Sequence, residues 1–238
     1  MSDYHFSQIR YRDKLAVRQM EQLLAQEGIE RDGNLDYTVG LYDEDYNLAA
    51  TGSCFGNTLR CLAVDNRHQG EGLLNQVISH LIDYQYRRGI LDLFLYTKCN
   101  TALFFKDLGF YEIARVEGKV VFMENRRGGF ERYLERLLAE TGQSGLTGKR
   151  VGAVVMNANP FTLGHAALAE RAARENERVV LFVLSEDRSL VPYKDRLAMV
   201  KAACAKYDNV SVVSSGSYMI SSATFPSYFL KDADIVTR

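Results

Sequence analysis

The feature that most constrains the fold of this chain is an apolar run that ends in a sharp turn and then a helix. Residues 151–156 read Val-Gly-Ala-Val-Val-Met, without the alternation of polar side chains that a half-exposed strand shows. Such a run is typical of a strand in a buried parallel sheet. The following turn contains Pro160, and we expect a helix from about Gly164 to Asn176. Strand, turn and helix in this order predict the first unit of a doubly wound α/β sheet.

The rest of the second half repeats this pattern, whereas the first half has a different one. Residues 179–184 and 210–213 read as further buried strands, and Pro192 suits the first turn of the helix between them. In the first half, period-2 and helical patterns predict a mixed α+β unit. Its expected strands are residues 4–9, 37–42, 48–55, 59–64, 91–96, 110–115 and 119–124, and its expected helices are 15–28, 72–88 and 102–108.

A composition change between the halves marks the expected domain boundary. Residues 130–140 have a helical apolar face, and residues 141–148 are rich in Gly, Ser and Thr. We therefore expect an α+β domain at residues 1–125, a helical linker at 126–148, and the first half of a Rossmann-like domain at 149–238.

The bulk composition excludes several classes of function. The net charge of −1 gives no overall attraction to nucleic acid or to anionic membranes. No apolar stretch approaches the roughly 18 residues that a membrane-spanning helix needs, and the N-terminus does not resemble a secretory signal. The four cysteines form no C-x-x-C pair, and no metal-ligand motif appears. We expect reduced thiols in a cytoplasmic protein that binds neither nucleic acid nor membrane.

The turn after residue 156 is the strongest candidate site. In doubly wound sheets ligands bind beyond the carboxyl ends of the strands, and a helix N-terminus attracts phosphate. The segment Thr162-Leu163-Gly164-His165 resembles the (H/T)-x-G-H motif of the nucleotidylyltransferase superfamily. The resemblance implies that Thr162 and His165 stabilise charge on the α-phosphate of ATP while pyrophosphate leaves. It also places Asn159, Pro160, Phe161 and Gly164 in the nucleotide-binding loop.

Two other segments of the second half are weaker candidates. Lys194 and Arg196 lie in the first turn of the next expected helix and could meet the triphosphate, although a solvated helix face is an equal alternative. Residues 220–224 superficially resemble a late superfamily signature. Pro226 occupies the place of its arginine, so residues 224–226 read better as a helix cap with an early proline.

A second motif lies in the first half. Leu62-Ala63-Val64-Asp65 followed by Gln69-Gly70-Glu71-Gly72-Leu73-Leu74 resembles motif A of GNAT-type acetyltransferases, whose backbone amides bind the pyrophosphate of coenzyme A. Two registers are open. One aligns Arg67, Gly70 and Gly72 with the motif, and the other aligns Gln69, Gly72 and Leu74. The resemblance implies cofactor-binding roles for Gln69, Gly70, Gly72 and Leu74.

Residues 104–110 resemble a late motif of the same fold, with one departure. Where the family often has a tyrosine that protonates the departing thiolate, this chain has Phe105, which has no proton to give. We therefore expect the fold without the acetyltransfer chemistry, and we expect Phe104, Phe105 and Phe110 to be core residues.

Both halves together resemble the citrate lyase ligase family over essentially the whole chain. The resemblance implies a ligase that uses ATP, with Mg²⁺ as its companion, to convert acetate into acetyl-adenylate, releasing AMP and diphosphate. The acetyl group would pass to the thiol of a dephospho-coenzyme A-type arm on the acyl carrier subunit of citrate lyase. The N-terminal domain would hold that arm or coenzyme A.

Two other functions remain open at this point. One is a GNAT-type acetyltransferase with a degenerate nucleotide-binding appendage, and the other is a non-catalytic coenzyme A sensor. Acetate-dependent exchange between ATP and pyrophosphate would separate the ligase from both. We also expect the chain to be C-terminally truncated, because 149–238 is short for a nucleotidylyltransferase domain and has no late Ser/Thr-x-x-Arg loop.

Overall fold

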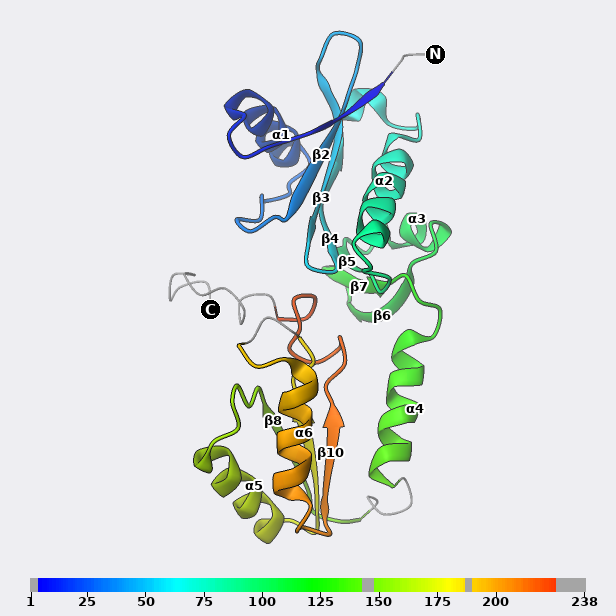
Figure 1. The fold of residues 1–238 in the computed structure, drawn as a ribbon. Helices are drawn as coiled ribbons and strands as arrows, with labels where there is room; N and C mark the ends of the chain where they lie inside the picture. The colour runs from blue at the N-terminus through cyan, green and yellow to red at the C-terminus, as the bar shows by residue number, and fades with distance from the viewer. Residues whose placement is uncertain (1–3, 143–147, 187–189, 226–238) are drawn as a thin grey trace. The chain divides into compact units, whose positions relative to one another are not determined.

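The computed structural model describes residues 4–142, 148–186 and 190–225 of the 238-residue chain. Contacts divide the chain into two units, Met1–Arg127 and Gly128–Arg238 (Figure 1). The first unit holds a mixed sheet and the second a parallel sheet, so the expected α/β fold class is confirmed.

The first unit is built on a seven-stranded sheet with the order β1-β2-β3-β4-β5-β7-β6. Neighbouring strands are antiparallel, except that β4 and β5 run parallel. The strands are β1 (His5–Gln8), β2 (Tyr37–Tyr42), β3 (Leu48–Phe55), β4 (Thr58–Val64), β5 (Phe94–Thr97), β6 (Tyr111–Val116) and β7 (Val120–Glu124).

Helices cover both faces of this sheet (Figure 1). Helix α1 (Lys14–Gln26) buries Met20, Leu23 and Leu24 against one face, and the Asp13 side chain caps its first turn. Helix α2 (Leu73–Arg87) buries Val77, Ile78 and Leu81 against the other face, which it shares with α3 (Ala102–Asp107). The approach of α2 to β3 requires a glycine, because a Cβ at Gly52 would lie 2.6 Å from Cγ1 of Val77.

The strands β4 and β5 diverge along their length. They pair only at Thr58 with Phe94 and at Leu59 with Leu95. The rest of β4 continues to Val64 without β5 beside it, and the chain then passes through the short 3-10 helix η1 (Asn66–His68) into α2. This divergence opens the sheet next to the N-terminus of α2.

The second unit is a three-stranded parallel sheet with the order β10-β9-β8. Its strands are β8 (Val151–Met156), β9 (Arg178–Val183) and β10 (Val210–Ser214), joined by α5 (Leu163–Glu175) and α6 (Tyr193–Cys204). Leu181, Val183 and Val200 are central to its core, and they are almost completely buried. The strand–helix–strand–helix–strand order expected from the sequence is therefore present.

Helix α4 (Gly129–Thr141) differs from the expected linker. It packs against β10, and its Tyr133 is buried and stacks near Tyr218. A Cβ at Gly216 would lie 2.9 Å from the Tyr133 ring, so the turn after β10 depends on a glycine there. Contacts thus group α4 with the second unit, because its aromatic face finds a partner that lies about 80 residues later in the chain.

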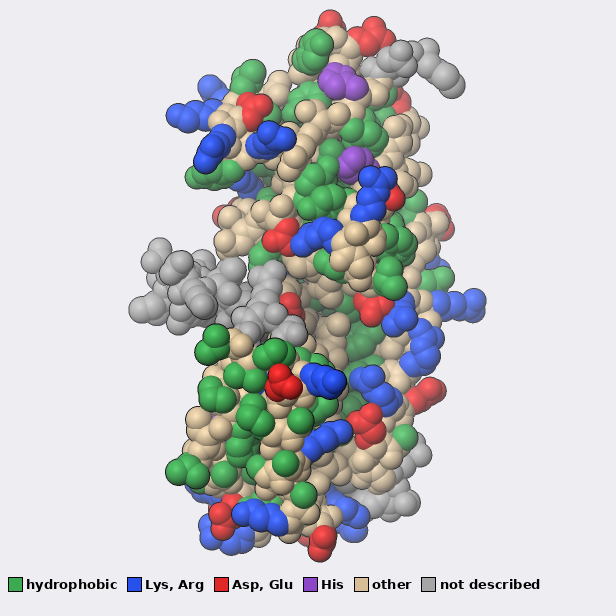
Figure 2. Space-filling view, in the orientation of Figure 1, with side chains coloured by type: hydrophobic (Ala, Val, Ile, Leu, Met, Phe, Trp, Pro, Cys, Tyr) green, Lys and Arg blue, Asp and Glu red, His purple; other side chains and the backbone are tan. Residues whose placement is uncertain are grey.

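Charged side chains of both signs are interspersed on the face shown in Figure 2, in keeping with the net charge of −1. Among the described residues, none of the helices combines the length and the apolar character that crossing a membrane requires.

Candidate functional site

The loop between β8 and α5 lies at the carboxyl end of the parallel sheet. Its Ala158 is fully buried with φ of +51°, a conformation that side chains other than glycine rarely adopt. Asn159 turns its side chain toward the next loop, where its Oδ1 accepts a hydrogen bond from Val191 N at 2.8 Å. Thr162 is the N-cap of α5, with extended backbone angles. The loop therefore presents the start of a helix at the place where doubly wound sheets bind ligands.

His165 is held by Thr162 in a single orientation. Its Nδ1 accepts a hydrogen bond from Thr162 N at 3.0 Å and lies 2.8 Å from Thr162 Oγ1. Because a backbone N–H can only donate, Nδ1 must be the unprotonated nitrogen, so a neutral ring carries its proton on Nε2. The Phe161 ring stacks on the imidazole at 5.6 Å between centroids. The predicted pair thus lies together, with an N–H donor left for a ligand.

The two cationic candidates of α6 separate in the structure. Lys194 is exposed in the first turn of the helix. Arg196 is completely buried, and its guanidinium donates to oxygen atoms of the protein itself. Neither of the two alternatives, contact with the triphosphate or a solvated helix face, describes Arg196. Its position four residues into the helix turns it toward the sheet.

Sequence reasoning missed a group of hydroxyls at the carboxyl ends of β9 and β10. Ser185 N donates to Ser215 Oγ at 2.9 Å, and Ser185 Oγ lies 2.8 Å from Ser214 Oγ. The carboxylate of Glu186 accepts hydrogen bonds from both the backbone N and the Oγ of Ser222. A polar residue directly after a buried strand is the signal that could have found Ser185 and Ser214.

The segment at residues 220–224 forms turns, and Ser221 N donates to Thr224 Oγ1 at 3.0 Å. Pro226, the proline of the expected helix cap, lies outside the described residues.

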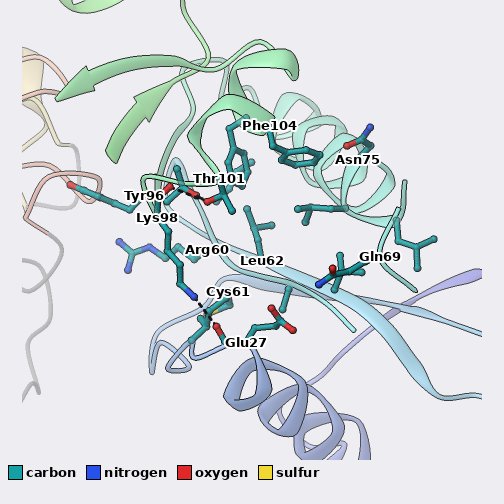
Figure 3. Close-up of a pocket in the computed structure, with 18 of the residues that line it drawn as sticks. Glu27, Arg60, Cys61, Leu62, Gln69, Asn75, Tyr96, Lys98, Thr101 and Phe104 are labelled. Carbon is teal, nitrogen blue, oxygen red and sulfur yellow. Dashed lines mark hydrogen bonds between the residues drawn. The ribbon is translucent and has the colours of Figure 1, made fainter. Parts of the chain in front are cut away.

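The first unit contains a cavity of about 780 Å³ where β4 and β5 diverge (Figure 3). The four residues predicted to bind a cofactor all line it: Gln69, Gly70, Gly72 and Leu74. Its other walls come from β4, β5 and α3, including Leu62, Tyr96 and Phe104. The cavity volume is within the range of small-molecule and cofactor sites.

The first turn of α2 lines this cavity. Gly72, with φ of +75°, precedes the helix, and Leu73, Leu74 and Asn75 of its first turn line the cavity. The first turn of an α-helix leaves N–H groups without intrahelical partners. A phosphate or pyrophosphate is the ligand that such a helix start favours.

The structure favours one of the two motif registers. Gln69 lines the cavity, whereas the Arg67 side chain is 72% exposed and binds the Asp65 carboxylate at 2.8 Å. The hydrogen bonds from Arg67 lower the pKa of Asp65 to about 2, so this carboxylate stays charged and fixes the turn before α2. The register that aligns Gln69, Gly72 and Leu74 therefore fits the cavity better.

The cavity lacks the expected acid of an acetyltransferase at its usual place. Phe105 is buried, and its ring packs edge-on against Phe104 and Phe110. Lys98 points its ammonium group at the backbone O of Glu27, at 3.0 Å, where both residues line the cavity (Figure 3). Burial raises the pKa of Tyr96, which keeps this phenol protonated. The arrangement suits binding of a phosphate-bearing arm.

Within the described ranges, no group of three or more His, Cys, Asp or Glu side chains is placed to hold a metal ion.

Comparisons with known proteins relate both halves of this chain to ligases of one family. Residues 151–238 match the family described as citrate lyase ligase C-terminal domain. The chain is 38% identical over 226 residues to citrate (pro-3S)-lyase ligase from Klebsiella pneumoniae, a match that covers 94% of this chain and 64% of that protein. A phosphopantetheine adenylyltransferase from Methylococcus capsulatus is 40% identical over 68 residues, 27% of this chain and 41% of that one.

Solved structures resemble the first half of the chain. A GNAT-family acetyltransferase from Staphylococcus aureus matches 52% of this chain and all of that chain, with 10% identity and a TM-score of 0.43. The chain spans a little under two thirds of the length of the ligases that it matches, 64% in the Klebsiella case. That similarity extends over nearly all of this chain, and the match to the citrate lyase ligase C-terminal domain begins at β8, so the chain resembles citrate lyase ligases through both of its units.

Proposed function

We propose that this chain carries out ATP-dependent activation of acetate and binds the arm that receives the acetyl group. In this reaction a carboxylate oxygen of acetate attacks the α-phosphorus of ATP, and the bond from that phosphorus to the β-phosphate oxygen breaks. Acetyl-adenylate forms and pyrophosphate leaves. A thiol then attacks the acetyl carbon, the thiol loses its proton, and AMP departs with the carbon–oxygen bond electrons. The acceptor would be the dephospho-coenzyme A-type arm of the citrate lyase acyl carrier subunit.

The observation that carries the proposal is the orientation of His165. Thr162 occupies Nδ1, which leaves the Nε2–H as a fixed donor at the start of α5. A donor held in advance stabilises developing charge on the α-phosphate without reorganisation during the reaction. Asn159, Pro160, Phe161 and Gly164 shape the loop around the nucleotide. The exposed Lys194 would approach the β- and γ-phosphates, and Mg²⁺ would arrive bound to those phosphates and to water.

The cavity of the first unit supplies a place for the acceptor arm. Its α2 start suits the pyrophosphate, and its apolar walls at Leu62 and Phe104 suit an extended thiol-bearing chain. Phe105 gives no proton to a departing thiolate, which favours binding of the arm over acetyl transfer from coenzyme A at this cavity. The cavity would then serve coenzyme A or its dephospho relative as a ligand.

His165→Ala tests the assignment directly. In this variant the rate of acetate-dependent exchange between ATP and labelled pyrophosphate should fall by about 10²–10³-fold. The loss of one preorganised hydrogen-bond donor has an effect of this size in other enzymes. Arg171→Ala is the control, because Arg171 is exposed on the same helix and its guanidinium pairs with Glu175 at 2.8 Å, away from the loop. Melting curves would show that both variants are folded. Near-normal exchange in folded His165→Ala, or no acetate-dependent exchange in the unmodified chain, would contradict the proposal.

A further inference from the structure

Arg196 is the largest of the fully buried side chains in the described part of the chain. Charged side chains are almost never fully buried unless their hydrogen-bonding groups are satisfied. It lies on α6, where its backbone N still bonds to Pro192 O, but its side chain extends under the carboxyl ends of β8 and β9. A buried guanidinium at this place therefore needs a reason beyond the stability of the helix.

Its five hydrogen bonds join three separate segments. Nη1 donates to the backbone O and the side-chain Oδ1 of Asn157, both at 2.9 Å, and to Leu184 O at 2.8 Å. Nε donates to Val191 O, and Nη2 donates to Glu186 O, each at 2.9 Å. The group thus ties the residue after β8 to the end of β9 and to the loop before α6.

These bonds hold the nucleotide loop on both of its sides. Asn157 is the first residue of that loop, and the Val191 N donates to Asn159 Oδ1 at 2.8 Å while its O accepts from Arg196. Between the two anchored residues lies Ala158, buried and in the left-handed region. A strained residue of this kind persists only when its surroundings hold it in place. The guanidinium fork supplies much of that support.

We propose that Arg196 is the positioning residue of the nucleotide site, which sets the loop geometry that His165 needs without touching ATP. This inference rests on the proposed function, because it assumes that the loop binds ATP. A planar fork with several N–H donors in fixed directions can bridge three segments, whereas a lysine ammonium cannot reproduce that geometry. Arg196→Lys should therefore keep the charge and lose the function of the residue.

The test compares ATP binding in three forms of the full chain. Calorimetry with Mg–ATP should show that Arg196→Lys lowers the affinity for ATP about tenfold or more. Small displacements of positioning groups can lower reaction rates 10²-fold. Val179→Ala is the matched control: Val179 is also almost fully buried, but it lies near the start of β9, away from the carboxyl end of the sheet that carries the loop. It should keep ATP affinity within about threefold.

A spectroscopic measurement separates positioning from general destabilisation. Nitrogen-15 spectra of the imidazole rings should show a single Nε2–H tautomer for His165 in the unmodified chain and in Val179→Ala, and a mixture in Arg196→Lys. ATP affinity and His165 tautomer unchanged in Arg196→Lys would overturn the inference. Absence of ATP binding by the unmodified chain would instead overturn the proposed function on which it rests.

Discussion

The four cysteines show how strongly single residues differ in their surroundings. Cys54, Cys61 and Cys204 are buried, and Cys99 is partly exposed with its Sγ 3.6 Å from Val116 O. Burial raises the pKa of all three buried thiols, and it raises that of Cys54 to about 12. Because only the thiolate is a good nucleophile, a buried thiol with a raised pKa reacts more slowly than an exposed one.

We therefore predict that iodoacetamide modifies Cys99 first in the folded protein at pH 8. At that pH a thiol with a pKa of about 12 is ionised in about one molecule in ten thousand. Mass spectrometry of timed samples would identify the modified positions, and unfolded protein, in which all four should react, is the control. Labelling of Cys54 as fast as Cys99 in the folded chain would show that the sheet opens there.

At the same scale, the sequence predicted that Thr162 and His165 lie together at the start of α5, but it did not predict the direction of the Arg196 side chain. Thr162 and His165 were recognisable because the motif, the preceding apolar run and the following helix coincide. The direction of the Arg196 side chain was not, because a helix position faces the sheet or the solvent according to packing that single-residue patterns do not contain. The positive φ of Ala158 likewise depends on contacts made by distant residues.

At the scale of elements, helix α2 has glycines with similar backbone angles at its two ends. Gly72 precedes the helix with φ of +75°, and Gly89 follows it with φ of +77°. A Cβ built at either position meets no described atom within 4 Å. Only Gly72 lines the cavity. Substitution of Gly89 therefore measures only the loss of stability caused by a side chain at positive φ. Substitution of Gly72 adds the effect of filling the ligand site.

Gly72→Ala and Gly89→Ala should each lose roughly 1 kcal/mol of stability, because alanine is strained at positive φ. Calorimetry with coenzyme A should show about tenfold weaker binding only for Gly72→Ala, whose methyl group would occupy ligand space beside the start of α2. Denaturant unfolding measures the stability of both. Equal coenzyme A affinities in the two variants would remove the start of α2 from the ligand site.

The order of elements was largely predictable, and their pairing was not. Local patterns gave the hairpin at the end of the first unit, now β6 and β7, and the three strands of the second. The sequence has no local signal for the pairing of β5 with β7, or for its brief contact with β4 that creates the cavity. The expected strand at residues 91–96 begins at Phe94, because Leu93 N instead donates to the Asn125 side chain.

For the molecule as a whole, the two ligand sites belong to different contact units. The nucleotide loop lies at the carboxyl end of the β8–β10 sheet, and the cavity lies between β4, β5 and α2. The supporting contacts of each candidate site come from its own unit: Val191 and Arg196 support the first, and Asp65 fixes the turn before the second. Candidate sites with separate support predict independent binding of their ligands.

Hydrogen exchange read by mass spectrometry tests that independence on the full chain. A ligand that binds only the folded state slows the local opening of the backbone that it contacts. Mg–ATP should therefore slow exchange in residues 157–166, and coenzyme A should slow it in residues 69–75, with little change in the other segment. Residues 77–81 of α2 provide an internal reference: Val77, Ile78 and Leu81 are buried in the first core, and the cavity lining includes none of the five. Protection of residues 69–75 by ATP alone would show that the two sites are coupled, and the acceptor arm would then be expected to bind more tightly once acetate has been activated.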